Sequence, residues 1–426
     1  MEINNLSLHF SRLIKIFKRN RSGASYVSLT IATTLIRFIK GFVLMKYLSL
    51  EDLGIITLIM AVMGLFSMLQ IGFLNGGYRI YSENHKDSKD VNNIIYSYFS
   101  IIISVIIFGI ILMGFLGKLN VTELVFALLA SFFGVLLVLN NWKRSVLISQ
   151  KRISEVNKLK IAAIIVSFVF LFTVPVWGLY GAILVTFSIE LVFYILAVWR
   201  TPDLLPTGFN FRFKQYKWVL SYGFLPFLSG VIIAYNMQLE TWSIASFLST
   251  EALGRFYLPR LYASLFLLIP VAVNQIFYPD VIKAYTKNDF STVKRTIKNY
   301  FIVNGAVSFF ILIITLLFIE KIIGIFVPKH LVGIPYVWLI LPGLIIYSMR
   351  VPLDLLFYAS NILRPFLWSA IVGVCFTTIF LISAGFLEKL SLEYVSIVKS
   401  MFYLIITCSL LLFYYKKKEI IWAKKN

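Results

Sequence analysis

Long apolar runs without charged residues are the feature that most constrains how this chain can fold. A helix needs about 20 mostly apolar residues to cross a bilayer. Eight uncharged runs are long enough for one such helix each, at residues 53–78, 91–117, 124–142, 218–239, 261–279, 299–319, 331–349 and 365–387. The sequence therefore predicts an all-α membrane protein.

Three further stretches complete the predicted set of spans. Residues 161–199 contain one charge and are too long for one span, and Pro175, Gly178 and Gly181 near the middle predict two helices joined by a tight turn. Two more helices, at residues 25–49 and 394–415, carry internal charges. The prediction is twelve transmembrane helices.

Charge is scarce in this chain of 426 residues, of which 14% are charged and 59% hydrophobic. Soluble domains have roughly 25% charged residues, so a soluble enzyme, a disordered protein and a fibrous protein are all disfavoured. The net charge of +21 would indicate a nucleic-acid partner in a soluble protein. Here the positive charges lie between the apolar runs, as in multispanning membrane proteins, so no nucleic-acid partner is expected.

Most of the 40 Lys and Arg residues fall in alternate connections and in the two terminal segments. Cytoplasmic loops carry such an excess, so both termini are expected in the cytoplasm. The predicted order is a cytoplasmic N-terminal segment, a first six-helix bundle, a basic cytoplasmic linker, a second six-helix bundle and a basic cytoplasmic tail. These parts have the bounds 1–24, 25–200, 201–217, 218–415 and 416–426.

An internal repeat relates the two halves. Residues 47–54 (YLSLEDLG) match residues 247–254 (FLSTEALG), with Leu, Ser, Glu, Leu and Gly identical. Because each half has an even number of spans, both enter the membrane from the same side, which makes a parallel repeat. Two such halves around a central cavity suit alternating access, and a duplication without mechanistic meaning is the alternative.

Signatures of catalysis and cofactor binding are missing from the sequence. The external connections are short, whereas a membrane glycosyltransferase or polymerase usually needs a sizeable external loop or domain. No GxxxxGKS or GxxxxGKT phosphate loop is present, and the two cysteines and three histidines are scattered. We therefore expect no enzyme activity, no cofactor and no metal site.

Three segments resemble the polysaccharide transporters of the multidrug/oligosaccharidyl-lipid/polysaccharide exporter superfamily. They are YLSLEDLGIITLIMAVMGLFSMLQIGFLNGGYR, NNWKRSVLISQKRISEVNKLK and NQIFYPDVIKAY. With the spans and the repeat, the resemblance covers nearly the whole chain, and the nearest type is the Wzx-like flippase for O-antigen or capsule repeat units. It implies transport of polyprenyl-pyrophosphate-linked oligosaccharides across a bacterial cytoplasmic (inner) membrane, beside a polysaccharide polymerase and chain-length machinery. The family has no sharp catalytic signature, so the match is one of pattern.

Four basic residues at membrane depth are the candidate substrate-binding residues. Arg37 and Lys40 are three apart, so they share one face of the first span. Arg260 in the eighth span and Lys399 in the twelfth are single cations. Charges at this depth usually face a protein interior or a water-filled cavity. Cations there suit an anionic ligand such as a pyrophosphate, and snorkelling or a structural ion pair is the alternative.

Two carboxylates are candidates for coupling or gating. Glu190 in the sixth span either binds a coupling proton, since burial favours a protonated carboxyl group, or pairs with a neighbour. Lys40 falls opposite Glu240 at the 200-residue offset of the repeat, at equal depth and with opposite charge. The two either meet as an external gate or each face their own neighbours.

The leading functional hypothesis is a flippase for lipid-linked oligosaccharides. A cation-coupled multidrug antiporter of the same fold is the first alternative, but cationic drugs favour an acidic cavity and the deep charges here are mainly basic. A membrane polymerase or ligase is the alternative from another class.

Overall fold

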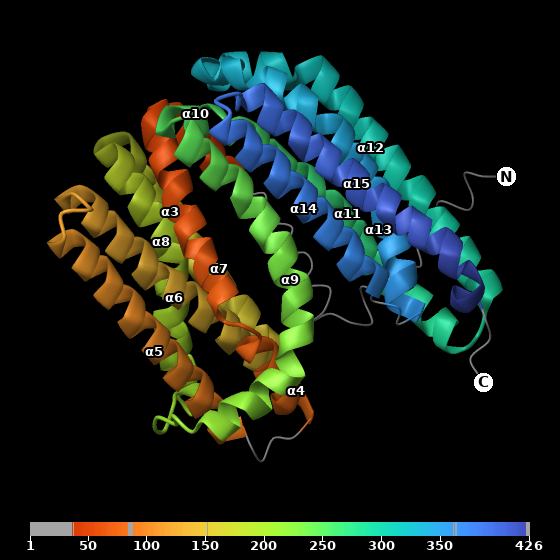
Figure 1. The fold of residues 1–426 in the computed structure, drawn as a ribbon, viewed down its shortest axis with the longest axis horizontal. Coiled ribbons are helices and arrows are strands. Elements are labelled where there is room, and N and C mark those ends of the chain that lie inside the picture. Colours follow the sequence, from red (N-terminus) through yellow and green to blue (C-terminus); the bar gives the residue numbers. More distant parts are fainter. Residues whose placement is uncertain are drawn as a thin grey trace. The chain divides into compact units, whose positions relative to one another are not determined.

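A computed structural model of the chain describes residues 36, 38–83, 88–150, 152–360, 362 and 364–422. Every regular element within these residues is a helix (Figure 1). The prediction of an all-α protein is confirmed. The predicted N-terminal segment, residues 1–24, lies outside the described residues.

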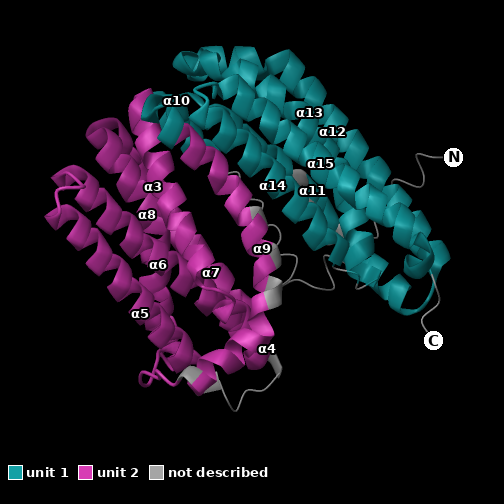
Figure 2. Ribbon diagram, viewed as in Figure 1, with its two compact units in different colours: residues 1–46, 246–426 teal, residues 47–245 magenta. Residues whose placement is uncertain are grey.

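The chain divides into two compact units (Figure 2). Unit 1 comprises residues 1–46 and 246–426, and unit 2 comprises residues 47–245. This grouping differs from the predicted six-helix bundles, because residues up to 46 group with the second half of the chain and residues 218–245 group with the first. Each unit is described by itself below.

Unit 2 contains seven α-helices in its described residues. They are α3 (Leu50–Leu69), α4 (Phe73–Glu83), α5 (Ser88–Phe115), α6 (Val121–Ser149), α7 (Ile153–Phe170), α8 (Val174–Arg200) and most of α9 (Phe213–Phe247), with the short 3-10 helices η2 (Leu171–Thr173) and η3 (Pro202–Leu204). Helix α6 packs against α3, α5 and α8. The predicted linker at 201–217 is therefore helical at both ends, in η3 and in the start of α9.

Unit 1 contains the helical residues 38–46 and the second series of helices. These are α10 (Thr250–Arg255), α11 (Tyr257–Thr286), α12 (Phe290–Phe326), the 3-10 helix η4 (Pro328–Gly333), α13 (Ile334–Ser360), α14 (Arg364–Phe386) and α15 (Leu392–Ile421). Helix α13 lies between α11 and α15 and packs against both. Because α15 continues to Ile421, the start of the predicted tail at 416–426 is helical.

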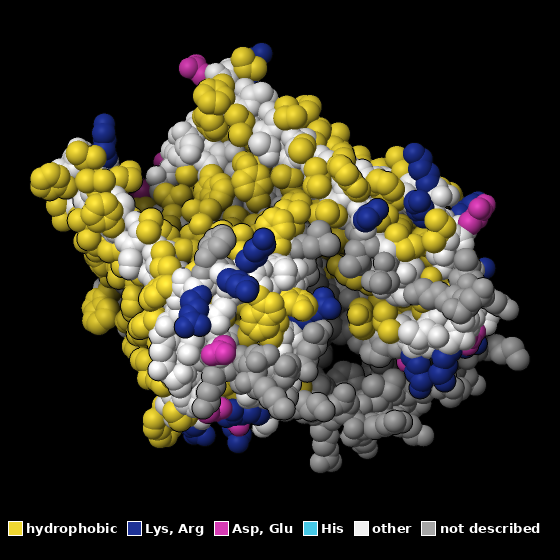
Figure 3. All heavy atoms as spheres, turned by 60° about the horizontal axis from the view of Figure 1, so that its bottom comes forward, with side chains coloured by type: hydrophobic (Ala, Val, Ile, Leu, Met, Phe, Trp, Pro, Cys, Tyr) yellow, Lys and Arg dark blue, Asp and Glu magenta, His cyan; other side chains and the backbone are white. Residues whose placement is uncertain are grey.

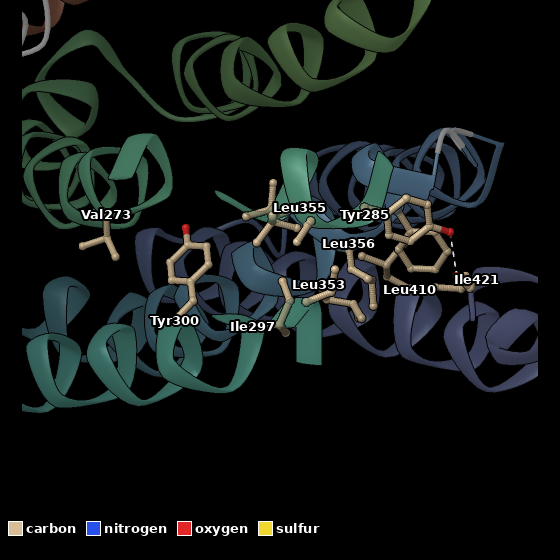
Figure 4. Close-up of a cluster of buried hydrophobic side chains, with 13 residues drawn as sticks. Val273, Tyr285, Ile297, Tyr300, Leu353, Leu355, Leu356, Leu410 and Ile421 are labelled. Atoms are coloured by element: carbon tan, nitrogen blue, oxygen red, sulfur yellow. Dashed lines mark hydrogen bonds between the residues drawn. The ribbon is translucent and has the colours of Figure 1, made fainter. Parts of the chain in front are cut away.

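Buried apolar side chains from four helices hold unit 1 together. Figure 4 shows the cluster, to which α11, α12, α13 and α15 contribute. The Tyr285 hydroxyl donates a hydrogen bond to the carbonyl oxygen of Ile421 at 2.6 Å, so the end of α15 is tied to α11. The Tyr300 hydroxyl donates to the carbonyl oxygen of Pro270 at 3.1 Å, which joins α12 to α11. These two buried hydroxyl groups are thus satisfied where the helices meet.

Eight helical stretches in the described residues are long and apolar enough to cross a membrane. One of them, Ile153–Arg200, contains both α7 and α8. Large apolar side chains such as Phe108, Phe115 and Phe310 are exposed on these helices, and hydrophobic side chains cover wide areas of the face in Figure 3. Such a surface is unfavourable in water and suits lipid. The chain is a multi-pass membrane protein, and the total of twelve spans stays a prediction.

The tight turn predicted within residues 161–199 is confirmed. Helix α7 ends at Phe170, η2 follows, and Gly178 near the start of α8 has φ +53°. Glycine adopts this left-handed conformation without the steric cost that a side chain would add. The long apolar stretch therefore reverses direction and forms the α7–α8 hairpin.

The repeated segments open equivalent helices with the same residues. The Ser49 hydroxyl accepts a hydrogen bond from Asp52 N at 3.0 Å at the start of α3, and the Ser249 hydroxyl accepts one from Ala252 N at 3.0 Å at the start of α10. In α3 the Asp52 carboxylate also returns to the backbone of Ser49, which completes a capping box. Ala252 cannot make this return bond. The identical serines thus have the same structural role, and only the first half has the second capping bond.

Helix α6 extends beyond the uncharged run at residues 124–142 and continues to Ser149. Lys143 and Arg144, the first charges after that run, lie inside the helix, and Lys143 is fully buried. The apolar residues Val146 and Leu147 continue the buried face beyond the first charge. A charge at this point of the sequence therefore does not mark the end of the helix.

Candidate functional site: a polar seam between α6 and α8

Two helix faces with the same residue spacing meet inside unit 2. Glu190, Phe193 and Tyr194 on α8 are spaced i, i+3, i+4 and so share one face. Asn140, Lys143 and Arg144 on α6 have the same spacing, and the two helices pack together. We call these six residues the α6–α8 seam.

Glu190 is held by two donors in the seam. Asn140 Nδ2 donates to Glu190 Oε2 and to the Glu190 carbonyl oxygen, both at 2.8 Å. An Arg144 guanidinium nitrogen lies 3.4 Å from the same carboxylate oxygen. Of the two alternatives raised from the sequence, the structure thus contains the pairing with neighbours. A role for Glu190 in coupling stays a prediction.

Both cations of the seam lie over aromatic rings of α8. The Arg144 guanidinium carbon is 4.5 Å from the centre of the Phe193 ring, and Lys143 Nζ is 5.8 Å from the centre of the Tyr194 ring. Cations within about 6 Å of a ring are attracted by its negative face. The Tyr194 ring therefore offsets part of the cost of burying Lys143, which is completely withdrawn from solvent.

A hydrogen-bonded network fixes the ends of the seam helices. Trp142 Nε1 donates to Asn92 Oδ1 at 2.8 Å, and Asn92 Nδ2 donates to the carbonyl oxygen of Leu204 at 3.0 Å. These bonds join α5, α6 and η3.

Arg152, which precedes α7, contacts Glu155 at 2.8 Å and Asp203 at 2.9 Å. The hydrogen bond to Glu155, together with the interactions with Asp203, raises the pKa of Arg152. The start of α7 and the end of α8 are thus linked by charge.

The predicted substrate-binding cations in the described residues all belong to unit 1. Lys399 on α15 is buried, and its Nζ lies 6.0 Å from the centre of the Phe256 ring. Arg260 is half-buried one helical turn after Phe256, at the start of α11. Lys399 thus lies over the Phe256 ring, and Arg260 follows Phe256 by one helical turn.

Lys40 lies half-buried in the helical residues 38–46. This segment is tied to the same region of unit 1, because a side chain at Gly41 would meet Leu261 of α11 and the carbonyl oxygen of Met45 is 3.1 Å from His330 Nε2. Arg37 lies outside the described residues.

Glu240 is buried on α9, in unit 2, whereas Lys40 belongs to unit 1. The gate between them stays a prediction.

Arg350 and Asp354 form a local ion pair on α13. The Arg350 Nε atom lies 2.9 Å from Asp354 Oδ1, one turn apart on α13, and both side chains are buried. Among the described residues, no group of three His, Cys, Asp or Glu side chains is placed to hold a metal ion.

Sequence reasoning missed Asn140, Lys143 and Arg144. The signal was present, since Asn140, Lys143 and Arg144 have the i, i+3, i+4 spacing of one helix face, and the buried residues Leu136, Leu139 and Leu147 fall on the same face. Counting apolar residues up to the first charge hides this pattern.

Comparison of the sequence with protein families gives one match. A model described as "Polysaccharide biosynthesis protein" matches residues 43–333. Comparison with curated proteins gave no significant match.

Solved structures of the MOP superfamily share the fold. Lipid II flippase MurJ in an inward closed conformation has a TM-score of 0.71 and 16% identity, covering 92% of this chain and 87% of that one. An inward-facing multidrug resistance MATE family transporter has a TM-score of 0.70 and 13% identity, covering 91% and 95%. A MOP superfamily transporter from Pyrococcus furiosus has a TM-score of 0.59 and 13% identity, covering 94% and 95%. The resemblance to this superfamily drawn from the sequence is confirmed.

Proposed function

Because the chain belongs to the polysaccharide biosynthesis protein family, we propose that it is a flippase for polyprenyl-pyrophosphate-linked oligosaccharides. The family match over residues 43–333 is the observation that carries the proposal, since it runs through helices of both units. The MOP fold supports a transporter rather than a polymerase or ligase.

Two buried lysines suit an anionic cargo, while the buried charges of the described residues as a whole are balanced by the carboxylates of Glu190, Glu240 and Asp354. Lys143 on α6 and Lys399 on α15 are less than a tenth exposed, although both lie on helices apolar enough to cross a membrane. Buried cations attract phosphate and repel cationic drugs. The pyrophosphate of a lipid-linked sugar matches the sign of these two lysines.

Within unit 1, the region around Phe256 is our candidate for pyrophosphate contact. Lys399 lies over the Phe256 ring, Arg260 follows Phe256 by one helical turn, and Gly41 in the segment with Lys40 packs against Leu261 of α11. Arg and Lys together supply charge-assisted hydrogen bonds to phosphate oxygens. In this proposal Arg37 adds a fourth cation from the same segment as Lys40.

Transport follows alternating access in this proposal, with Glu190 as the proton-coupling residue and Lys40 and Glu240 as the external gate. The protein resides in a bacterial cytoplasmic membrane, with both termini in the cytoplasm, and works beside a polysaccharide polymerase and its chain-length machinery. Surface polysaccharide, O-antigen or capsule, is the product of the pathway it serves.

Transport by purified protein in liposomes tests the function. A fluorescent polyprenyl-pyrophosphate oligosaccharide is incorporated in both leaflets, and its movement is followed by chemical quenching from outside. We expect rapid, protein-dependent loss of the protected signal. A cationic dye that is moved while the oligosaccharide is not would refute the flippase and support the antiporter.

The Lys399→Met variant tests the contact region in the same assay. Loss of a phosphate-binding cation should slow transport at least about tenfold. This factor corresponds to about 1.4 kcal/mol in the free-energy barrier of transport. Lys389→Met is the matched control, because Lys389 is exposed in the connection between α14 and α15. Equal rates for Lys399→Met and Lys389→Met would remove Lys399 from the binding site.

A further inference from the structure

Two prolines interrupt helix α13 in unit 1. Pro342 and Pro352 lie inside the helix rather than in its first turn. A proline has no N–H group, so it cannot donate the hydrogen bond that an α-helix makes to the carbonyl oxygen four residues earlier. For Pro352 this is the carbonyl oxygen of Ser348, a residue that is fully buried. An oxygen in such a place needs another donor.

Helix α12 supplies the missing donor. Asn304 Nδ2 donates to the Ser348 carbonyl oxygen at 2.6 Å, and Asn304 is itself almost fully buried. The hydroxyl groups of Ser308 and Ser348 lie 2.8 Å apart, which adds a second polar contact between the same two helices. Membrane helices tolerate interior prolines where neighbouring helices satisfy the freed backbone groups. The gap in the hydrogen-bond ladder at Pro352 is thus closed by a side chain.

The ladder next to Pro342 also contains a side chain from another helix. The Ser400 hydroxyl of α15 accepts from Gly343 N at 3.2 Å and donates to the carbonyl oxygen of Leu339 at 2.6 Å. It also lies 3.2 Å from the carbonyl oxygen of Ile340. Gly343 N and the Leu339 oxygen are partners in an uninterrupted helix. Helix α13 is therefore held at two points by side chains of two different helices.

The two sides of Pro352 are packed differently. From Pro352 to Phe357 every residue of α13 is buried, next to the core shared with α11, α12 and α15. Before the gap, residues 345–347 are half-buried. The segment after the gap is therefore the anchored one. Asn304 Oδ1 has no donor among the described residues, so the amide that closes the gap is only half satisfied.

We propose that α13 is hinged at Pro352 and that the Asn304 side chain is a latch that holds the hinge in its present shape. When the latch opens, the segment before Pro352 pivots on the buried segment after it. The Arg350–Asp354 pair, whose members lie on either side of Pro352, follows this movement. On the basis of the proposed function, we assign the pivoting to the transport cycle.

A double-variant cycle tests the latch. Asn304→Leu removes the donor to Ser348 and should lower the thermal unfolding midpoint in detergent micelles by about 4 °C. Pro352→Ala returns an N–H group to position 352, which can donate to Ser348 itself. In the Pro352→Ala background, Asn304→Leu should therefore lower the midpoint by about 1 °C or less. Equal losses in both backgrounds would show that Asn304 does not replace the missing backbone donor, and would overturn the proposal.

Pro342→Ala is the matched control, because Pro342 interrupts the same helix but frees the carbonyl oxygen of Trp338 instead. In this background, Asn304→Leu should still lower the midpoint by about 4 °C. A loss as small as in the Pro352→Ala background would mean that any straightening of α13 compensates for Asn304, and would refute a latch at Ser348.

Hydrogen–deuterium exchange of the same variants tests the hinge. Amides of residues 343–351 should exchange at least about threefold faster in Asn304→Leu than in the wild type, and those of residues 353–357 should be unchanged. Pro352→Ala should slow the exchange of residues 343–351. Unchanged exchange of this segment in Asn304→Leu would refute the hinge.

Transport in liposomes separates the hinge from the proposed function. Pro352→Ala should slow movement of the oligosaccharide at least about fivefold without a lower midpoint, because a continuous helix resists bending. Pro365→Ala should keep the wild-type rate, since Pro365 lies in the first turn of α14, where proline costs no helical hydrogen bond. A wild-type rate in Pro352→Ala would overturn the part of the hinge in transport. Absence of transport by the wild type would refute the proposed function, and the midpoints and exchange rates would still decide the hinge.

Discussion

Replacing Glu190 separates its structural and transport roles most directly. Asn140 is fully buried and its Nδ2 lies 2.8 Å from Glu190 Oε2, so this is a charge-assisted hydrogen bond, a kind that contributes about 1.5–3 kcal/mol. The Arg144 contact is longer, at 3.4 Å, and its side chain is 22% exposed, so it adds at most about 1 kcal/mol.

These magnitudes predict an order of stability. Glu190→Gln keeps the shape of the side chain and one acceptor oxygen. It should lower the free energy of unfolding by about 1 kcal/mol, which is the difference between a charged and a neutral hydrogen bond. Glu190→Leu leaves Arg144 without this carboxylate and should lose about 3 kcal/mol. Asn140→Leu combined with Glu190→Leu should lose less than the sum of the single changes, with a coupling energy of about 2 kcal/mol.

Unfolding of the purified variants in detergent micelles, followed by circular dichroism, measures these free energies. Lys158→Met, on the exposed face of α7, serves as the unperturbed control. If Glu190→Gln lowers the free energy of unfolding as much as Glu190→Leu does, the remaining acceptor oxygen of Gln does not stabilise the fold, and the predicted order is wrong. Additive losses in the double variant, within about 0.5 kcal/mol, would also contradict the prediction, because they would show that Asn140 and Glu190 do not interact.

Transport by Glu190→Gln then tests coupling. Since this variant should fold, a lower rate and a flatter dependence on the proton gradient would assign the coupling proton to Glu190. The wild-type dependence in the variant would make Glu190 a structural residue of the seam.

Three further predictions concern the caps and the gate. Ser49→Ala should lower stability by about 1–2 kcal/mol and Ser249→Ala by about 1 kcal/mol, since only Ser49 belongs to a full capping box, and equal losses in thermal unfolding would contradict this. Hydrogen bonds from the Thr292 side chain and then from Ser291 hold the pKa of Asp289 at about 2, so its stabilisation of the start of α12 is complete above its ordinary value near 4 and is lost as the pH falls through about 2. The unfolding midpoint of Asp289→Ala should therefore depend less on pH between 5 and 2 than that of the wild type, and parallel curves would refute the effect. Lys40→Glu and Glu240→Lys should each impair transport and the double exchange should restore much of it, whereas additive losses would rule out the gate.

Local chemistry made several elements predictable from the sequence. The turn between α7 and α8 follows from Pro175, Gly178 and Gly181, because these residues disfavour a continuous helix. The Arg350–Asp354 pair follows from spacing on a single helix. In each case the residues that decide the structure are neighbours in the sequence.

The seam was not predictable in the same way. Glu190 is paired with Asn140, which lies 50 positions earlier on another helix, and a sequence alone does not say which helix faces which. The extent of α6 was missed for a related reason, since Lys143 is buried by the packing of α6 against other helices and lies over the Tyr194 ring of α8. Tertiary packing decides both features.

The discontinuous composition of unit 1 has a consequence for biogenesis. The segment with Gly41 and Met45 is synthesised early, yet its contacts, Leu261 and His330, come from the second half of the chain. At translation rates of about 5–20 residues per second, the segment waits at least about 10 s for its first partner, while residues 47–245 emerge as one continuous unit. This early segment is thus among the last parts of unit 1 to complete its contacts. During this interval it depends on the insertion machinery or on lipid, rather than on the rest of unit 1, to keep its orientation.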